Sequence, residues 1–238
     1  MIQAARLCKF AVYSTGRQVK PRMLNMQFDQ PVAINTNEME WEASPMPGVW
    51  RKPLAREAAE HGHTTSLVRY DAGSSFSPHL HPRGEEILVL EGVFSDEHGD
   101  YPAGTYIRNP PGSKHSPRSE PGCVLLVKLD QFDPADDATA RVDTNRCEWF
   151  PGEDRLRVMP LHYFDTEMVA LYKWPAGTRS EPHQHFGGEE VFVMSGAMLD
   201  EYGRYPAGTW IRNPHNSEHC PYVEEDTVIW IKTGHMLP

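Results

Sequence analysis

Two stretches of forty residues decide the fold of this chain. Residues 78–117 read PHLHPRGEEILVLEGVFSDEHGDYPAGTYIRNPPGSKHSP, and residues 182–221 read PHQHFGGEEVFVMSGAMLDEYGRYPAGTWIRNPHNSEHCP. They align without a gap at an offset of 104 residues and are identical at 23 of the 40 positions. The same offset pairs Pro47-Gly48 with Pro151-Gly152 and Lys128 with Lys232. A unit of about 100 residues has the size of a small domain, not of a solenoid repeat. The sequence therefore predicts two tandem copies of one domain.

The copies suggest a division of the 238 residues into three parts. We expect an N-terminal extension at 1–35, partly disordered or pairing as an edge strand, then one domain at 36–135 and another at 136–238. The joint falls in the polar, Pro-containing residues 133–137, which suit a linker. Residues 1–28 carry five basic and no acidic side chains. They are a basic arm, a targeting segment, or an extension that precedes a true start at Met23 or Met26.

Short strands separated by turn formers dominate both copies. The 18 Gly and 21 Pro are scattered among Val, Ile, Tyr and Phe, which favours an all-β domain. Residues 54–60 could add one or two helical turns. The expected strands are 66–70, 86–90, 105–108 and 124–129 in the first copy, and 170–174, 190–194, 209–212 and 228–233 in the second. This pattern is typical of a small antiparallel barrel or jelly roll.

Composition excludes several classes of function. A formal charge of −10 disfavours nucleic acid as a partner, because phosphates demand a basic face. No apolar run reaches the 18 residues that a membrane-spanning helix needs. The four cysteines have no C-x-x-C spacing, so we expect no disulfide framework and a cytoplasmic location.

Histidines in both copies have the spacing of metal ligands. His79 and His81 stand at positions i and i+2 of an expected strand, so their side chains share one face. Glu85 has the same parity as the pair and Glu86 the opposite one, which favours Glu85 as a ligand unless a bulge at the preceding glycine exchanges them. His115 lies on a later hairpin that a barrel would bring opposite.

The second copy repeats this set as His183, His185, Glu189 and His219. One H-x-H pair is commonly incidental, but six of the twelve histidines fall in these repeated positions. Three imidazoles and a carboxylate suit Zn, Fe, Mn, Ni or Co, and they leave coordination positions for water or substrate. We therefore expect up to two divalent transition-metal ions per chain.

The full spacing resembles both motifs of the cupin superfamily. The first copy reads Gly73-x5-His79-x-His81-x3-Glu85-x6-Gly92 and then Gly104-x5-Pro110-x-Gly112-x2-His115, and the second repeats it at +104 with Asn216 in place of the last Gly. The Asn that closes the second motif is replaced by Ser119 and Val223. More narrowly, the chain resembles the cupin domain of ChrR-type anti-sigma factors. The resemblance implies two tandem double-stranded β-helix barrels, with the eight residues named above as ligands.

One departure limits what the resemblance implies. In ChrR-type proteins a separate N-terminal zinc-binding helical domain, rich in His and Cys, binds the sigma factor. Residues 1–40 are too short for that domain and offer only Cys8. The resemblance therefore implies the metal-binding module, without the anti-sigma activity.

Three functions fit this module. The first is a small-molecule-responsive or regulatory metalloprotein of ChrR-like type, and the alternative is a non-haem, metal-dependent dioxygenase acting on a small organic substrate. A hydrolase or isomerase using the metal as a Lewis acid is the third. The expected partner is a small molecule, and a homodimer through edge strands is one further possibility.

Other repeated or altered residues leave alternatives open. Arg108 and Arg212, with Tyr101 and Tyr205, recur in both copies and line a pocket or anchor the fold. The loop before the third histidine places Lys114 in the first copy and Glu218 in the second. This difference predicts a preference for an anionic ligand in the first copy and tighter metal retention in the second. His215, present only in the second copy, could coordinate the metal, hydrogen-bond a ligand or face water.

Overall fold

A computed structural model describes residues 23–58 and 61–237 of the chain. Within these residues the extended elements are all β-strands, and the single helical element is one 3-10 turn, η1 (Thr36–Glu38). The all-β prediction is confirmed. In the part of the chain described, no helix is long and apolar enough to cross a membrane. The basic segment at residues 1–22 lies outside the described residues.

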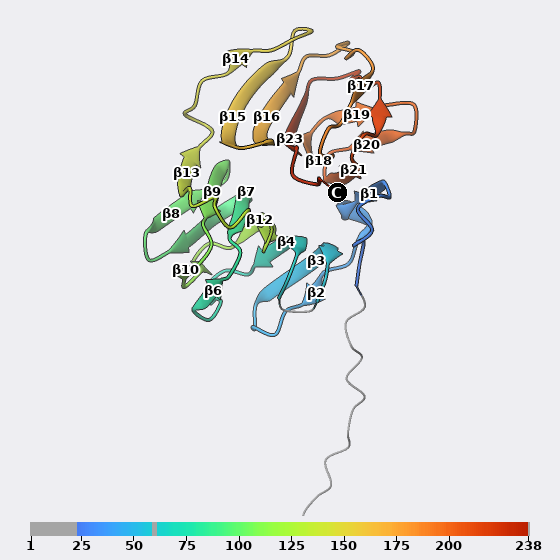
Figure 1. Ribbon diagram of the computed structural model, residues 1–238. Helices are drawn as coiled ribbons and strands as arrows, with labels where there is room; N and C mark the ends of the chain where they lie inside the picture. The colour runs from blue at the N-terminus through green and yellow to red at the C-terminus, as the bar shows by residue number, and fades with distance from the viewer. Residues whose placement is uncertain (1–22, 59–60, 238) are drawn as a thin grey trace, which may run out of the picture.

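The first copy builds one large antiparallel sheet, seen in the lower half of Figure 1. Its strands lie in the order β13-β9-β7-β12-β4-β3-β2; β8 and β11 also pair with β7, and β5 pairs with β11. A separate pair, β6 and β10, closes one end of the barrel. The strands are β2 (Glu42–Ala43), β3 (Val49–Arg56), β4 (Thr64–Tyr70), β5 (Ser74–Ser75), β6 (His79–His81), β7 (Glu85–Asp96), β8 (Gly99–Pro102), β9 (Thr105–Asn109), β10 (Ser113–His115), β11 (Arg118–Ser119), β12 (Cys123–Leu129) and β13 (Ala140–Asp143).

The second copy repeats this arrangement in the upper half of Figure 1. Its large sheet has the order β1-β21-β18-β23-β16-β15-β14, and two small pairs, β17 with β22 and β19 with β20, complete the barrel. The strands are β1 (Val32–Asn35), β14 (Phe150–Pro151), β15 (Arg157–Phe164), β16 (Glu167–Trp174), β17 (His183–Gln184), β18 (Glu189–Ser195), β19 (Ala197–Leu199), β20 (Arg204–Pro206), β21 (Thr209–Asn213), β22 (Glu218–His219) and β23 (Thr227–Thr233).

Side-chain alternation along these strands gives each sheet two apolar faces. In β7, Ile87 and Val89 point into the first barrel, where they pack with other residues of the first copy. Leu88, between them, points the other way into a core that also holds Trp210 and Trp230 of the second copy. Successive residues of a strand face opposite sides, so one run of apolar residues supplies both cores. The two barrels are therefore held together by a shared hydrophobic layer.

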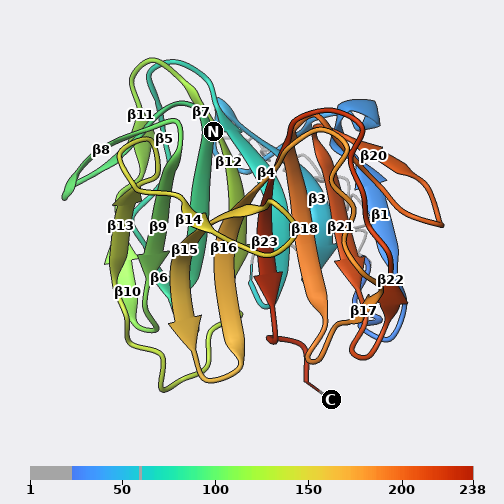
Figure 2. The same cartoon turned by 90° about the horizontal axis from the view of Figure 1, so that it is seen from above.

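The copies also exchange their first strands. β1 pairs with β21 of the second barrel through Val32↔Arg212, whereas β13 pairs with β9 of the first barrel through Ala140↔Arg108. Figure 2 shows these two strands at opposite outer edges. A threonine fixes each exchanged strand, because Thr36 Oγ1 donates to Gly208 O at 2.7 Å and Thr144 Oγ1 donates to Gly104 O at 2.6 Å. Each barrel is thus completed by a segment that the sequence division assigns to its neighbour or to the extension.

Charged side chains cross the shared layer in reciprocal pairs. Lys128 Nζ of the first copy lies 2.5 Å from Glu190 Oε2, and Lys232 Nζ of the second lies 2.9 Å from Glu86 Oε2. All four side chains are buried. Each glutamate follows a predicted metal ligand directly, and its opposite parity sends it into the shared layer.

The predicted strands each lie within an observed strand. The helical turn expected at residues 54–60 is wrong for its first three residues, since β3 continues to Arg56. Leu54 and Ala55 are completely buried there, and a bulge beside Pro53 keeps the strand paired with β4. Burial of this pair in the shared core outweighs local helical preference. Residues 59 and 60 lie outside the described part.

Candidate metal centres

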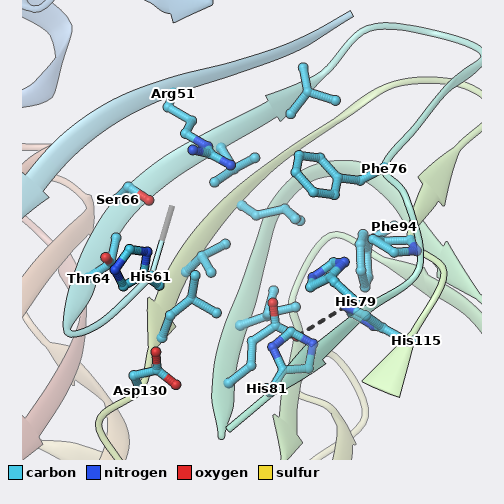
Figure 3. A pocket seen from close by; sticks show the side chains of 18 of the residues that line it. Arg51, His61, Thr64, Ser66, Phe76, His79, His81, Phe94, His115 and Asp130 are labelled. Carbon is cyan, nitrogen blue, oxygen red and sulfur yellow. Dashed lines mark ion pairs between the residues drawn. The ribbon is translucent and has the colours of Figure 1, made fainter. Parts of the chain in front are cut away.

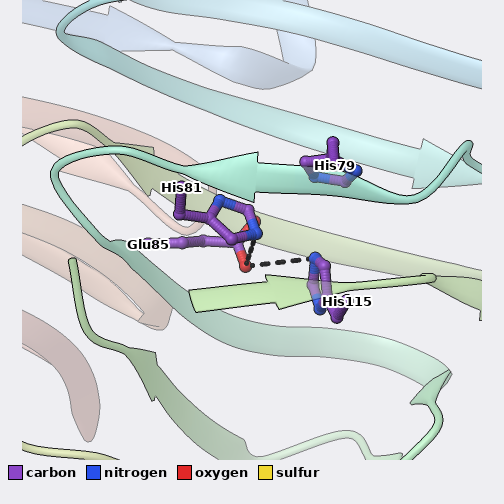
Figure 4. Close-up of side chains that lie close together, drawn as sticks. All are labelled: His79, His81, Glu85 and His115. Carbon is purple, nitrogen blue, oxygen red and sulfur yellow. Dashed lines mark ion pairs between the residues drawn. The ribbon is translucent and has the colours of Figure 1, made fainter. Parts of the chain in front are cut away.

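The first candidate metal centre is held by β6, β7 and β10. β6 and β10 are antiparallel with His79 directly opposite His115, and His81 projects from the same face of β6 as His79. Glu85 begins β7 immediately after the turn at Gly84. Figure 4 shows the four side chains converging from these three strands. The sequence left open whether Glu85 or Glu86 joins the histidines; the structure brings Glu85 there and sends Glu86 to the opposite face.

Distances within this set fit a single small cation. One ligand atom from each of the four residues lies within 4.8 Å of all the others. His81 Nε2 and His115 Nε2 are each 3.4 Å from Glu85 Oε2. Ligands bound at about 2.1 Å with angles between octahedral and tetrahedral stand roughly 3.0–3.4 Å apart. The residues are therefore spaced as the ligands of one transition-metal ion.

The unsatisfied nitrogens of this site support the fit. Nε2 of His81 and Nε2 of His115 are buried and have no hydrogen-bond partner. Buried polar atoms are rarely left without a partner, so two that face one point indicate a binding site at that point. Burial lowers the pKa of His81 despite the nearby Glu85 charge, which favours the neutral imidazole that binds metals. The donor set and the orphaned atoms together fit a divalent ion.

A second layer of contacts orients the ligands. Asn109 Nδ2 donates to Glu85 Oε2 at 2.8 Å, and the His79 ring places Nδ1 2.7 Å from the Ser77 carbonyl. Asp96 Oδ2 lies 3.6 Å from His115 Nδ1. Burial lowers the pKa of His115, but the Asp96 and Glu85 carboxylates outweigh it, so the pKa is raised. Asp96 thus stands behind the ring where a carboxylate can orient a metal-binding histidine, and at 3.6 Å the two atoms form an ion pair without a hydrogen bond.

The second centre repeats the first at +104. His183 lies opposite His219 on β17 and β22, and Glu189 Oε1 is 3.6 Å from His185 Nε2 and 3.8 Å from His219 Nε2. The Nε2 atoms of His185 and His219 are buried without partners, as in the first barrel. Asp200 lies 3.2 Å from His219 Nδ1. The structure thus brings together all eight residues proposed from the sequence, four in each barrel.

Tyr101 and Tyr205 belong to the second layer of these centres. Each donates its hydroxyl at 3.0 Å to the aspartate behind the third histidine, Asp96 or Asp200. Neither repeated arginine faces a metal. Arg108 is buried between the barrels among Glu86, Asp136 and Glu167, and Arg212 donates to backbone carbonyls of residues 25 and 27. Of the two interpretations of the repeated arginines, the structural anchor is the one observed.

The loop before the third histidine differs from expectation. Lys114 is exposed on β10, and its side chain does not line the cavity of the first barrel. The preference for an anionic ligand cannot rest on it. His215 does not join the second ligand set; its Nδ1 accepts a hydrogen bond from Gly187 N at 2.8 Å and so braces the loop after His185.

A third group of metal-binding residue types lies between the barrels. Asp136, His162 and Glu167 come within 4.8 Å of one another. Arg108 contacts both carboxylates, and Lys232 Nζ lies 2.8 Å from Glu167 Oε1. The same two cations also pair with Glu86, and each carboxylate of the group already has a cationic partner. This group is an ion-pair network that joins the copies.

Each centre opens on a cavity inside its barrel. In the first barrel the cavity has a volume of about 260 Å³, and Figure 3 shows the histidines on one side of it and Arg51, Thr64 and Ser66 on the other. Aromatic side chains at Tyr70, Phe76 and Phe94 complete its lining. In the second barrel the cavity has a volume of about 790 Å³. A small molecule can therefore reach the ligand set from within each barrel.

The fold and its paired His/Glu sets define a two-barrel protein of the cupin type with two candidate metal centres. The ChrR cupin-like domain model matches the chain twice, at residues 29–133 and 137–237, and the chain belongs to this family. The resemblance inferred from the motifs is thereby confirmed.

Solved structures of low sequence identity share the fold. A putative dioxygenase from Nostoc punctiforme is 15% identical with a TM-score of 0.73, over 88% of this chain and 84% of its own. YlbA from Escherichia coli is 13% identical with a TM-score of 0.66, over 87% and 92%. An oxalate decarboxylase from Bacillus subtilis is 15% identical with a TM-score of 0.60, over 86% and 77%. No functionally curated protein matches the sequence.

Proposed function

We propose that the chain is a small-molecule-responsive metalloprotein of ChrR-like type, in which a ligand binds directly to the metal of the first barrel. The observation that carries this proposal is that the buried Nε2 atoms of His81 and His115 have no hydrogen-bond partner and lie at the wall of a cavity. When bound, a divalent ion would supply Lewis acidity and open coordination positions there. Glu85, His79, His81 and His115 would hold it, and the cavity would admit the ligand.

Metal analysis followed by cobalt substitution tests this proposal. Protein purified without chelators should contain transition metal, up to two ions per chain, and Co²⁺ should replace it. Because the visible spectrum of Co²⁺ reports its ligands, small oxygen-donor molecules should change the spectrum of the first centre. A chain that binds no transition metal on reconstitution, or a Co²⁺ spectrum that no small molecule changes, would contradict the proposal.

A dioxygenase is the second candidate. It is favoured by the apolar part of the first cavity, formed by Phe76, Phe94 and Tyr70 beside a four-residue ligand set that leaves positions open. The solved structure of the Nostoc protein is described as that of a putative dioxygenase, at an identity where only the fold is shared. Oxygen consumption by the iron-loaded protein with a panel of small organic substrates distinguishes the two candidates. Turnover supports the enzyme, whereas binding without turnover supports the responsive protein.

A further inference from the structure

The strand that crosses into the first barrel carries an arginine that the second barrel lacks. β13 follows the joint between the copies, lies beside β9 in Figure 2, and pairs Arg141 with Ile107. In the second barrel β1 takes the place of β13 and pairs Ala33 with Ile211, which aligns with Ile107 at the offset of 104. Ala33 therefore occupies the position of Arg141.

Through Asn109, Arg141 fixes the hydrogen bond that Glu85 accepts. Arg141 Nη2 donates to Asn109 Oδ1 at 2.6 Å, and Asn109 Nδ2 donates to Glu85 Oε2 at 2.8 Å. A guanidinium only donates hydrogen bonds, so it holds the oxygen of the amide on its own side. The amino group of Asn109 then has to face the carboxylate. Because Asn109 is buried, water does not readily replace either partner.

Through Tyr101, the same guanidinium acts on the aspartate behind His115. Arg141 Nε donates to the Tyr101 hydroxyl at 3.2 Å, and that hydroxyl donates to Asp96 Oδ1 at 3.0 Å. Since the hydroxyl oxygen accepts from the guanidinium, its own proton is directed to Asp96. Burial raises the pKa of Tyr101, so the phenol keeps this proton. The other oxygen of Asp96 is left facing His115 Nδ1.

The remaining hydrogen bonds of Arg141 anchor its strand. Nη1 donates to the carbonyl oxygens of Arg108 at 2.8 Å and of Ala140 at 2.7 Å. The Thr144 hydroxyl, which donates to Gly104 O, anchors the same strand. Anchoring by Nη1 requires neither Nε nor Nη2, and these two atoms contact the residues behind the candidate ligands. The arginine therefore has two separable sets of contacts.

The second centre makes the corresponding contacts without an arginine. Asn213 Nδ2 donates to Glu189 Oε1 at 3.0 Å, and the Tyr205 hydroxyl donates to Asp200 Oδ1 at 3.0 Å. Ala33, at the position of the arginine, has no side-chain donor for either residue. The two centres therefore match in their candidate ligands and in the asparagine, tyrosine and aspartate behind them. They differ in the group that holds the asparagine and the tyrosine.

We propose that Arg141 is a positioning residue of the first metal centre, supplied by the second half of the chain. By fixing the Asn109 amide it orients Glu85, and by fixing the Tyr101 hydroxyl it holds the aspartate behind His115. The first centre is thus completed by the exchanged strand. This inference rests on the proposed function, because it concerns the metal to which the small molecule would bind.

The Co²⁺ affinity of each centre, measured separately, tests the proposal. The His185→Ala background leaves the first centre to be loaded, and the His81→Ala background leaves the second. Arg141→Ala, which installs the residue of the second barrel, should raise the Co²⁺ dissociation constant of the first centre by roughly 10–100-fold, as is typical when a residue that orients a metal ligand is lost. It should also change the visible Co²⁺ spectrum of the first centre. The affinity of the second centre should stay unchanged.

Three further variants separate positioning from anchoring. Thr144→Val is the matched control, because it removes another anchor of β13 without touching Asn109 or Tyr101; it should lower the melting temperature and leave both Co²⁺ affinities unchanged. Arg141→Lys keeps the charge but offers one nitrogen, so it should recover only part of the affinity. In a background with Asn109→Ala and Tyr101→Phe, Arg141→Ala should have no further effect on the first centre, because its contacts to the ligands are already broken. The melting temperature shows that each variant is folded.

The outcomes distinguish this inference from the function on which it rests. Equal losses of Co²⁺ affinity for Arg141→Ala and Thr144→Val would overturn the inference, since the arginine would then act only as an anchor of the strand. An unchanged affinity and spectrum after Arg141→Ala would overturn it too, as would a full further loss in the background that lacks Asn109 and Tyr101. In these cases the wild-type protein still binds metal and the proposed function stands. A wild-type chain that binds no Co²⁺ at either centre would overturn the proposed function and this inference with it.

Discussion

Replacing Lys128 with Met should strongly destabilise the protein by leaving a buried carboxylate unpaired. Lys128 and Glu190 have side chains only 1% exposed, and 2.5 Å separates their charged atoms. Burial raises the pKa of Glu190, but the Lys128 charge and the hydrogen bond from His235 outweigh it and hold the pKa well below its usual range, so the carboxylate is ionised. Without Lys128, the Glu190 carboxylate keeps two hydrogen-bond partners among the described residues, Trp210 Nε1 at 3.2 Å and His235 Nε2 at 3.4 Å.

The expected magnitude follows from this geometry. Removing one partner of a buried ion pair costs about 3–5 kcal/mol, because the other charge stays desolvated. At roughly 2–4 °C per kcal/mol for a chain of this size, the melting temperature should fall by about 6–20 °C. Lys128→Met combined with Glu190→Gln should recover most of this loss, since a neutral amide costs far less to bury.

Urea unfolding of chelator-treated protein measures these differences without a contribution from metal binding. Lys114→Met serves as a matched control, because Lys114 is exposed and its loss should change the unfolding free energy by less than about 0.5 kcal/mol. A loss below about 1 kcal/mol for Lys128→Met would refute the reasoning, as would a double variant no more stable than the single one.

Three further predictions concern the metals and pH. Wild-type protein should bind two divalent ions per chain, and His81→Ala or His185→Ala should each remove one, because the ligands are segregated by barrel; elemental analysis checks this count. Metal binding stabilises the folded state, so chelator at neutral pH should lower the melting temperature. Each ion should also be lost as pH falls through the histidine range near about 6.5, because a protonated imidazole does not bind metal. A melting temperature that chelator leaves unchanged would exclude a structural contribution of the metal. Burial and the Lys128 charge lower the pKa of His63 to about 3 in the folded state. The unfolded chain therefore binds a proton at His63 at a higher pH than the folded chain does. The contribution of neutral His63 to the free energy of unfolding is complete above about pH 6.5 and is lost as pH falls toward about 3. His63→Gln should therefore reduce the slope of the unfolding free energy against pH below about 6.5 in chelator-treated protein. A slope equal to that of the wild type would count against a neutral His63 in the folded protein.

The sequence predicted the ligand sets because their geometry is local. His79 and His81 share a face through strand parity, and the same parity separates Glu85 from Glu86. The third histidine of each set was predicted because the repeat places His115 and His219 at the same position in the two copies. The shared layer between the barrels could not be predicted, since Lys128 and Lys232 each pair with a glutamate of the other copy. Nothing in one copy indicates such a partner.

Strand exchange escaped prediction for a related reason. Residues 32–38, VAINTNE, match residues 140–146, ARVDTNR, at an offset of 108, not 104. Alignment at the main offset therefore misses them, although the shared Thr-Asn pair was a usable signal.

The two faces of each strand serve different parts of the molecule, so the two cavities differ in their lining while the layer between the barrels is alike. Outward-facing residues are kept in both copies: Glu86 and Glu190, or Lys128 and Lys232, hold the barrels together. Ser66 lines the first cavity, and its counterpart Ala170 packs in the core of the second barrel, so this difference does not touch the shared layer. Because the metal ligands come from β6, β7 and β10, the opposite wall can change without disturbing them. The lining of one cavity can therefore change without loss of the candidate metal ligands or of the layer that joins the barrels.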